Sequence, residues 1–94
     1  METYSFDEAA YERLRQAGIT WRSVLDVLHI PPRLRQPIGA VLRVAGQDRD
    51  GRWLLVILIE DEASDNAFQI VTARELHDQE AAGIARLLDE GSNR

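Results

Sequence analysis

The sequence contains no cysteine and no lysine, and its longest uninterrupted apolar stretch is only seven residues, 53–59. The absence of cysteine excludes disulfide bonds, thiolate metal sites and cysteine nucleophiles. Seven apolar residues are far fewer than the ~20 that a membrane-spanning helix needs, so we expect no membrane segment. The N-terminal METYSFDEAA has neither the basic nor the apolar region of a signal peptide, and a cytoplasmic location is therefore expected.

The charge is distributed unevenly along the chain. All 11 basic residues are arginine, which fits the codon usage of a GC-rich genome and also suits bidentate contacts with phosphate. Residues 13–52 hold eight arginines against three aspartates, whereas residues 53–94 hold three arginines against nine acidic residues, within a net charge of −5. The acidity argues against a protein that coats nucleic acid, while the basic middle allows one local anion-binding face.

The apolar stretch WLLVILI at residues 53–59 predicts the central strand of a sheet. A strand that is apolar at every position must be covered on both faces, and the preceding Asp50-Gly51 is typical of a hairpin turn. The stretch is also short and rich in β-branched residues, which disfavours a helix. Residues 40–46 predict the strand paired with it through this turn. Residues 67–74 predict a third strand, on which Phe68, Ile70 and Thr72 face one side and Gln69, Val71 and Ala73 the other.

Two short helices are predicted before the sheet and one after it. Asp7 is a good N-cap for a helix that runs to about residue 17, and Thr20 caps a second helix that ends before Pro31-Pro32. Residues 33–39 read as a connection, and residues 78–88 as the last helix. Ninety-four residues make a single domain, 1–94. The predicted fold class is α+β, with an antiparallel three- to four-stranded sheet whose possible edge strand is residues 4–6.

Three segments carry a resemblance to a known family: FDEAAYERLRQAGITWRSVLDVL at 6–28, VLRVAGQDRDGRWLLVILIED at 41–61, and QIVTARELHDQE at 69–80. In order and spacing they resemble the BrnT family of toxins from type II toxin–antitoxin systems, over about residues 6–81. The most specific part is Thr72-Ala73-Arg74, with Glu80 six residues after Arg74. The resemblance implies a RelE-like ribonuclease fold.

The resemblance also implies a function and a site. It implies a metal-independent, cofactor-free endoribonuclease that inhibits translation and is neutralised by a cognate antitoxin, a small DNA-binding protein. The RNA substrate would be cleaved by attack of its 2′-oxygen on the neighbouring phosphate. The implied catalytic residues are Arg74, His77 and Arg52, and the implied substrate-binding residues are Arg43, Arg52 and Arg74, which we expect to converge. A sheet that is apolar on both faces further indicates an antitoxin-like partner or a homodimer.

Alternatives remain for these residues. Arg43 is also consistent with a sheet arginine that pairs with a carboxylate such as Glu60, and His77 with an exposed helix-capping residue. His29 is expected to be structural at a helix C-terminus. The tyrosines and tryptophans, among them Tyr11 and Trp21, are expected in the core. No Ser/His/Asp set, glycine-rich phosphate loop or metal-ligand spacing occurs in the sequence.

A second functional class is also open. The Lys-His that the BrnT family carries before its first glycine is Gln16-Ala17 here, and the family's Thr that caps the last helix is His77. The chain is therefore also consistent with a non-catalytic BrnT-like interaction domain that binds a partner protein. Convergent arginines in a cleft would favour the ribonuclease, whereas pairing of each arginine with a carboxylate would favour the interaction domain.

Overall fold

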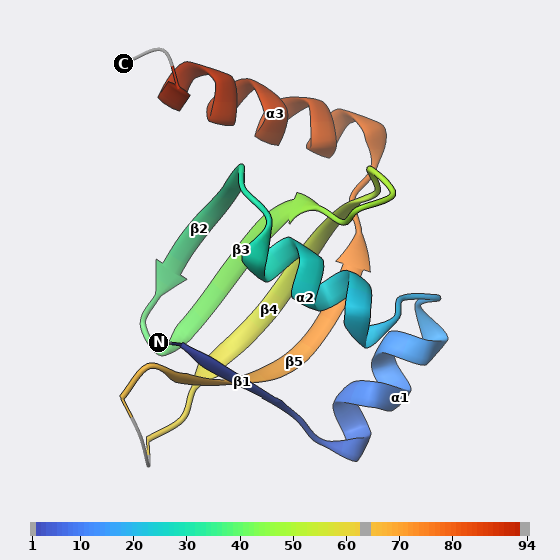
Figure 1. Ribbon diagram of the computed structural model, residues 1–94, viewed down its shortest axis with the longest axis vertical. Coiled ribbons are helices and arrows are strands. Elements are labelled where there is room, and N and C mark those ends of the chain that lie inside the picture. The colour runs from blue at the N-terminus through green and yellow to red at the C-terminus, as the bar shows by residue number, and fades with distance from the viewer. Residues whose placement is uncertain (1, 63–64, 93–94) are drawn as a thin grey trace.

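The computed structural model describes residues 2–62 and 65–92, which form a five-stranded sheet with three helices (Figure 1). The strand order is β1-β5-β4-β3-β2, and only the β1–β5 pair is parallel. The elements are β1 (Thr3–Phe6), α1 (Glu8–Gln16), α2 (Trp21–His29), β2 (Arg33–Ile38), β3 (Val41–Gln47), β4 (Trp53–Glu60), β5 (Ala67–Glu75) and α3 (Asp78–Ser92). This order confirms the predicted α+β class, with β4 as the central strand.

The sheet has five strands, one more than the upper limit of the predicted three to four. Arg33–Ile38, predicted as a connection, is the edge strand β2 and pairs with all of β3 except its last residue. The strand was not predicted because the segment is rich in arginine and proline. Pro37 lacks a backbone N–H, but an edge strand does not need this donor at every position. The possible edge strand at residues 4–6 is confirmed as β1. Within the described part of the chain, no helix is long and apolar enough to cross a membrane.

The predicted helix starts are confirmed. The Asp7 carboxylate accepts a hydrogen bond from the Ala10 N–H at 2.7 Å, and the Thr20 hydroxyl accepts one from the Ser23 N–H at 3.1 Å. The expectation that Tyr11 and Trp21 lie in the core is wrong, since both are 48% exposed. The helical positions that face the sheet are instead filled by smaller aliphatic residues, namely Ala10, Leu14, Val24, Val27 and Leu28.

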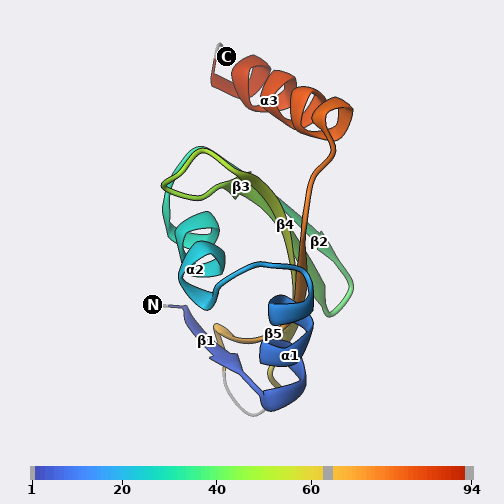
Figure 2. The same cartoon turned by 90° about the vertical axis from the view of Figure 1, so that its right-hand side faces the viewer.

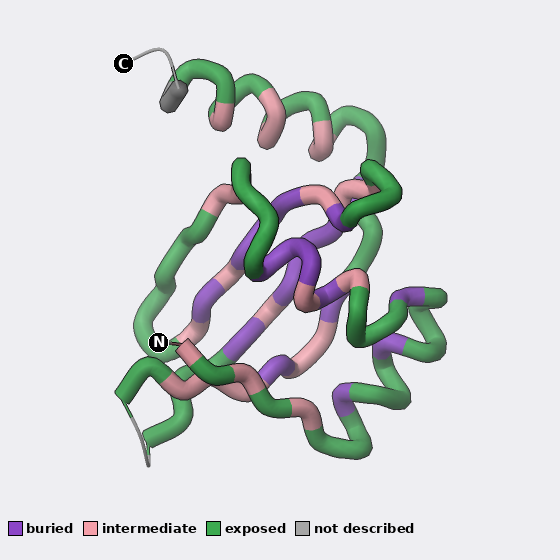
Figure 3. The backbone as a smooth tube through the Cα atoms, in the orientation of Figure 1, coloured by how far each residue is buried: buried purple, intermediate pink, exposed green. Residues whose placement is uncertain are grey.

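The two faces of the sheet are covered very differently (Figures 2 and 3). On one face, α1 and α2 pack against alternate residues of the central strands and close the larger core, which includes Leu54, Val56 and Leu58. On the other face lies a small cluster of Ala45, Leu55 and Leu76, against which α3 packs only Ala81 and Ile84 among its described side chains. Most of α3 is exposed or half-buried (Figure 3). The C-terminal helix therefore covers one end of the second face.

A β-bulge in β5 decides which of its side chains reach each face. Leu58 pairs with Ile70 and Ile57 pairs with Thr72, so Val71 is an extra residue on β5. The predicted alternation of faces is therefore wrong beyond Ile70, because Ala73 enters the larger core and Thr72 faces the opposite side. The Val71 carbonyl accepts a hydrogen bond from Arg13 Nη1 of α1 at 3.1 Å.

Candidate functional site

The candidate site is a pocket of about 350 Å³ between the second face of the sheet and α3. Its walls are largely apolar, and its ionisable groups come from β3, β5 and the first turn of α3. The lining residues are Arg43, Ala45, Leu55, Arg74, Leu76, Gln79, Glu80, Gly83, Ile84 and Leu87. A concave apolar surface with a few convergent polar groups is the usual form of a binding site.

Arg74 reaches this pocket because of the bulge in β5. It pairs with Leu55 of β4, whose side chain belongs to the α3 side of the sheet. Its two terminal nitrogens donate to the two carboxylate oxygens of Glu80, at 2.9 and 2.8 Å. This bidentate hydrogen bonding raises the pKa of Arg74.

Glu80 is held by two different groups. Besides the bond to Arg74, its carboxylate accepts a hydrogen bond from the His77 backbone N–H at 3.0 Å, which is half of a capping box at the start of α3. The hydrogen bonds from Arg74 and then from His77 lower the pKa of Glu80 to about 2. The capping pattern was visible in the sequence, as a glutamate three residues after the capping residue His77, but the bond of Glu80 to Arg74 was not.

Arg43 lies in the middle of β3 on the same face as Arg74. Arg43 pairs with Ile57 of β4. Two residues away along these strands, Ala45 pairs with Leu55, which in turn pairs with Arg74 of β5. The expected carboxylate partner is absent among the described residues: Arg43 donates only a long 3.5 Å bond to Gln36 Oε1. Arg43 is therefore the pocket cation with the most unused hydrogen-bonding capacity.

Arg52 lies elsewhere. Its Nη1 donates to the Gly18 carbonyl at the α1–α2 junction, at 3.1 Å, and its Nη2 is 3.2 Å from Glu75 Oε2. Arg52 does not line the pocket. The structure thus brings together two of the three arginines that the sequence predicted to converge.

The two histidines have distinct surroundings. His77 is exposed, immediately before α3 and three residues after Arg74, in the position of a helix cap. His29 ends α2, where Nδ1 lies 2.9 Å from the Leu25 carbonyl and the ring packs edge-on against Tyr4. The position of His29 agrees with the expected structural role.

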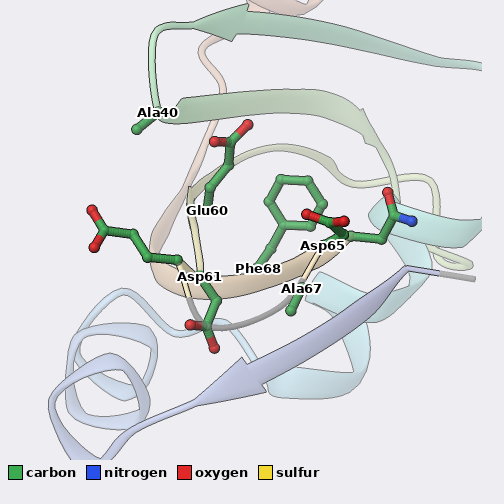
Figure 4. A pocket seen from close by; sticks show the side chains of 8 residues that line it. Ala40, Glu60, Asp61, Asp65, Ala67 and Phe68 are labelled. Atoms are coloured by element: carbon green, nitrogen blue, oxygen red, sulfur yellow. The ribbon is translucent and has the colours of Figure 1, made fainter.

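The far end of the sheet is acidic. The start of β5 and the end of β4 border a hollow lined by Glu60, Asp61, Glu62 and Asp65 around Phe68 (Figure 4). This end repels polyanions, whereas the two arginines lie toward the α3 end. No group of three or more histidine or acidic side chains within residues 2–62 and 65–92 is arranged to hold a metal ion.

The fold has a known counterpart. No family profile matches the sequence, and no curated protein sequence matches it either. The structure matches the crystal structure of the Brucella abortus ribonuclease toxin BrnT with a TM-score of 0.63 and 13% sequence identity, over 83% of this chain and 100% of that chain. The chain has a BrnT-like fold. The resemblance in fold that the three sequence segments indicated is therefore confirmed, and Arg43 and Arg74 can be placed on one face of a BrnT-like sheet.

Proposed function

We propose that this chain is the toxin of a type II toxin–antitoxin system, a metal-independent cytoplasmic endoribonuclease that inhibits translation. Residues 1–94 act as one BrnT-like domain, and a cognate DNA-binding antitoxin neutralises it. The observation that supports the proposal is the pocket under α3, where a BrnT-like fold carries two arginines, Arg43 and Arg74, on apolar walls.

The pocket suits a phosphodiester. When the RNA 2′-oxygen attacks phosphorus, negative charge grows on the two non-bridging oxygens, and fixed cations lower the energy of that state. Arg74 already holds two oxygens of a carboxylate side by side, at 2.9 and 2.8 Å, which is the fork that a phosphate would use. Arg43 adds a second charge from the neighbouring wall. The apolar walls lower the local dielectric and strengthen both contacts.

His77 is assigned to proton transfer. An imidazole is the commonest protein group for this task. His77 lies three residues beyond Arg74, immediately before α3, and next to the pocket residue Leu76 in the chain, although it is not itself part of the pocket lining. Glu80 is a poor general base at neutral pH because its pKa is about 2. Arg52 is assigned an indirect role: it supports the end of β5 through Glu75.

A non-catalytic interaction domain is the second candidate, and three observations favour it. Arg74 and Arg52 are both paired with carboxylates, Gln16-Ala17 replaces the family's basic pair, and the sheet face beyond α3 exposes apolar side chains. Ile38 is 53% exposed and Ile59 37% exposed. A partner protein or a second copy of the chain is proposed to cover this face in either functional class.

Expression of the chain alone in a bacterial host separates the two candidates. The ribonuclease arrests growth and leaves RNA fragments that end in a 2′,3′-cyclic phosphate, because the attacking 2′-oxygen stays bound to phosphorus. Folded protein that causes no arrest and no cleavage would leave the interaction domain. Arg86→Ala is a matched control for Arg74→Ala, since Arg86 is an exposed arginine of α3 outside the pocket lining. Sedimentation of the purified chain then tests for the homodimer.

A further inference from the structure

The proposed phosphate-binding side chain is already occupied by an anion from the same chain. Glu80 takes up both terminal nitrogens of Arg74, at 2.9 and 2.8 Å. The ionisable groups that line the pocket are Arg43, Arg74 and Glu80, so the lining carries a net charge of +1 with the glutamate in place. With Glu80 withdrawn, the lining would carry +2.

The helix that carries Glu80 is attached to the sheet over a small area. The chain is anchored as far as Leu76, which is buried and whose N–H donates to the Trp53 carbonyl at 3.0 Å. Beyond it, α3 projects past the end of the sheet, away from α1 and α2 (Figures 1 and 2). Among the α3 side chains that the structure describes, only Ala81 and Ile84 pack on the small cluster, and Leu87 remains 53% exposed. The pocket lies beside these contacts, between α3 and the sheet.

We propose that Glu80 acts as an internal competitor of the RNA phosphate, and that α3 is a latch that must release Arg74 before substrate binds. This inference rests on the proposed ribonuclease function, whose site it regulates. The carboxylate mimics two oxygens of a phosphodiester on the same guanidinium. An antitoxin or substrate that displaces α3 would change the availability of Arg74 without altering the larger core.

The capping role of Glu80 can be separated from its charge. Glutamine at this position keeps an oxygen that can accept the His77 N–H, because capping boxes use glutamate and glutamine alike. Glu80→Gln therefore preserves the start of α3 while it removes the competing anion. Glu90→Gln makes the same change in net charge on the same helix, ten residues or ~15 Å farther along its axis.

The decisive measurement is the Kd for a 2′-O-methylated pentanucleotide, which cannot be cleaved because its attacking oxygen is blocked. An exposed ion pair is worth up to about a fivefold change in an equilibrium constant, so we expect Glu80→Gln to bind about fivefold tighter than wild type. Glu90→Gln should bind less than about twofold tighter. The double variant Arg74→Ala/Glu80→Gln should lose the gain. Equal affinities for Glu80→Gln and Glu90→Gln, or no binding by wild type and Glu80→Gln, would overturn the latch.

A second measurement uses the wild-type chain and does not depend on the variants. RNA bound at Arg74 must displace Glu80, so the NMR signals of the Glu80 carboxylate and the His77 amide should shift together as the pentanucleotide saturates the protein. A shift of the Arg74 guanidinium signals alone would contradict the latch. If Glu80→Gln binds more tightly but no variant cleaves unmodified RNA, the latch stands and the ribonuclease proposal fails.

Discussion

The central strand β4 presents two unlike surfaces, one from each alternate set of its residues. Leu54, Val56 and Leu58 are fully buried against α1 and α2. Their neighbours Leu55, Ile57 and Ile59 face α3 or open solvent, and exposure increases away from α3 until Ile59 is 37% exposed. The sequence is equally apolar on both faces, so the difference comes from the cover that the rest of the chain provides.

Polar groups follow the same division. The strand residues that pack against α1 and α2 in the larger core are apolar, and the buried Asp26 of α2 is paired with Arg49. The opposite face of the sheet carries Arg43, Thr72 and Arg74 among its aliphatic residues. A buried face stabilises the fold, and a partly covered apolar face with fixed cations is suited to binding. The comparison predicts that mutations on the first face will change stability, and mutations on the second will change binding and activity.

Leu54→Ala should have the largest effect. The side chain is completely buried, and removal of its methyl groups leaves a cavity in the larger core. We expect a loss of about 2–5 kcal/mol in the free energy of unfolding, measured by urea denaturation. Ile59→Ala, on the same strand but the other face, should cost about 1 kcal/mol or less. Similar losses for both would show that the second face is also covered in solution.

Arg74→Ala should lower activity and leave stability unchanged, in contrast to Leu54→Ala. Loss of the bidentate contact should reduce RNA cleavage by about 10²–10³, while the urea midpoint stays within error of wild type. Initial rates on a defined RNA measure the first quantity, and Arg86→Ala is the control. Cleavage by Arg74→Ala at the wild-type rate would remove Arg74 from the site.

His77→Ala should reduce the cleavage rate by about 10², because proton transfer is lost and the phosphate contact remains. The variant should also flatten the pH–rate profile, which a purely structural capping role would not do. The affinity for the 2′-O-methylated RNA should stay unchanged. A weaker affinity with an unaltered pH profile would mean that His77 only caps α3.

Asp26→Asn tests an ion pair on the helix-covered side. Asp26 accepts three hydrogen bonds from Arg49, at 3.0 to 3.2 Å, and the side-chain bonds from Arg49 lower its pKa. A lowered pKa stabilises the fold above the ordinary carboxyl pKa and loses this effect as the pH falls. Asp26→Asn should therefore lower the Tm by about 5 °C at pH 7 and by less in acid. Asp89→Asn, exposed on α3, is the control. A loss of Tm in Asp26→Asn that did not depend on pH would contradict the stabilising role of the Asp26–Arg49 ion pair.

Glu80→Gln should have a small effect on stability, because its partner Arg74 is exposed. The pKa of Glu80 is about 2, below the ordinary 4.5, so the pair is complete above about pH 4.5 and is lost as the pH falls through 2. The difference in Tm between wild type and Glu80→Gln should be constant from pH 7 to 5 and vanish near pH 2. NMR titration of the Glu80 carboxyl measures the same pKa, and a midpoint near 4.5 would mean that the pair does not form in solution.

Much of the fold could be predicted because local signals agreed with the final structure. The caps at Asp7 and Thr20, the Asp50-Gly51 turn and the apolar run of β4 depend on nearby residues alone. β2 was missed because its strand identity comes from its pairing with β3, which composition does not record. Tyr11 and Trp21 were misplaced because both helices present a face wider than the sheet can cover.

The site was harder to predict. Arg43 and Arg74 both line the pocket, because they lie on the two strands that flank β4 and face the same side of the sheet. Arg52 was expected to join them, but its side chain donates a hydrogen bond to Gly18 at the α1–α2 junction, and the sequence around Arg52 does not show this contact. The Arg74–Glu80 bond depends on the direction in which α3 leaves the sheet, and no local pattern encodes that direction.

The extra residue Val71 decides which face of the sheet each later side chain of β5 occupies. Every side chain after it has changed faces relative to a regular strand, so the position of Arg74 in the pocket depends on a count of residues as well as on its identity. If Val71 entered the ladder opposite Ile57, with no residue removed, Arg74 would pair with Leu54 instead of Leu55 and its guanidinium would turn away from the pocket. Substitutions in this strand are graded in effect, whereas loss of the bulge would exchange the two faces of its last residues in a single step.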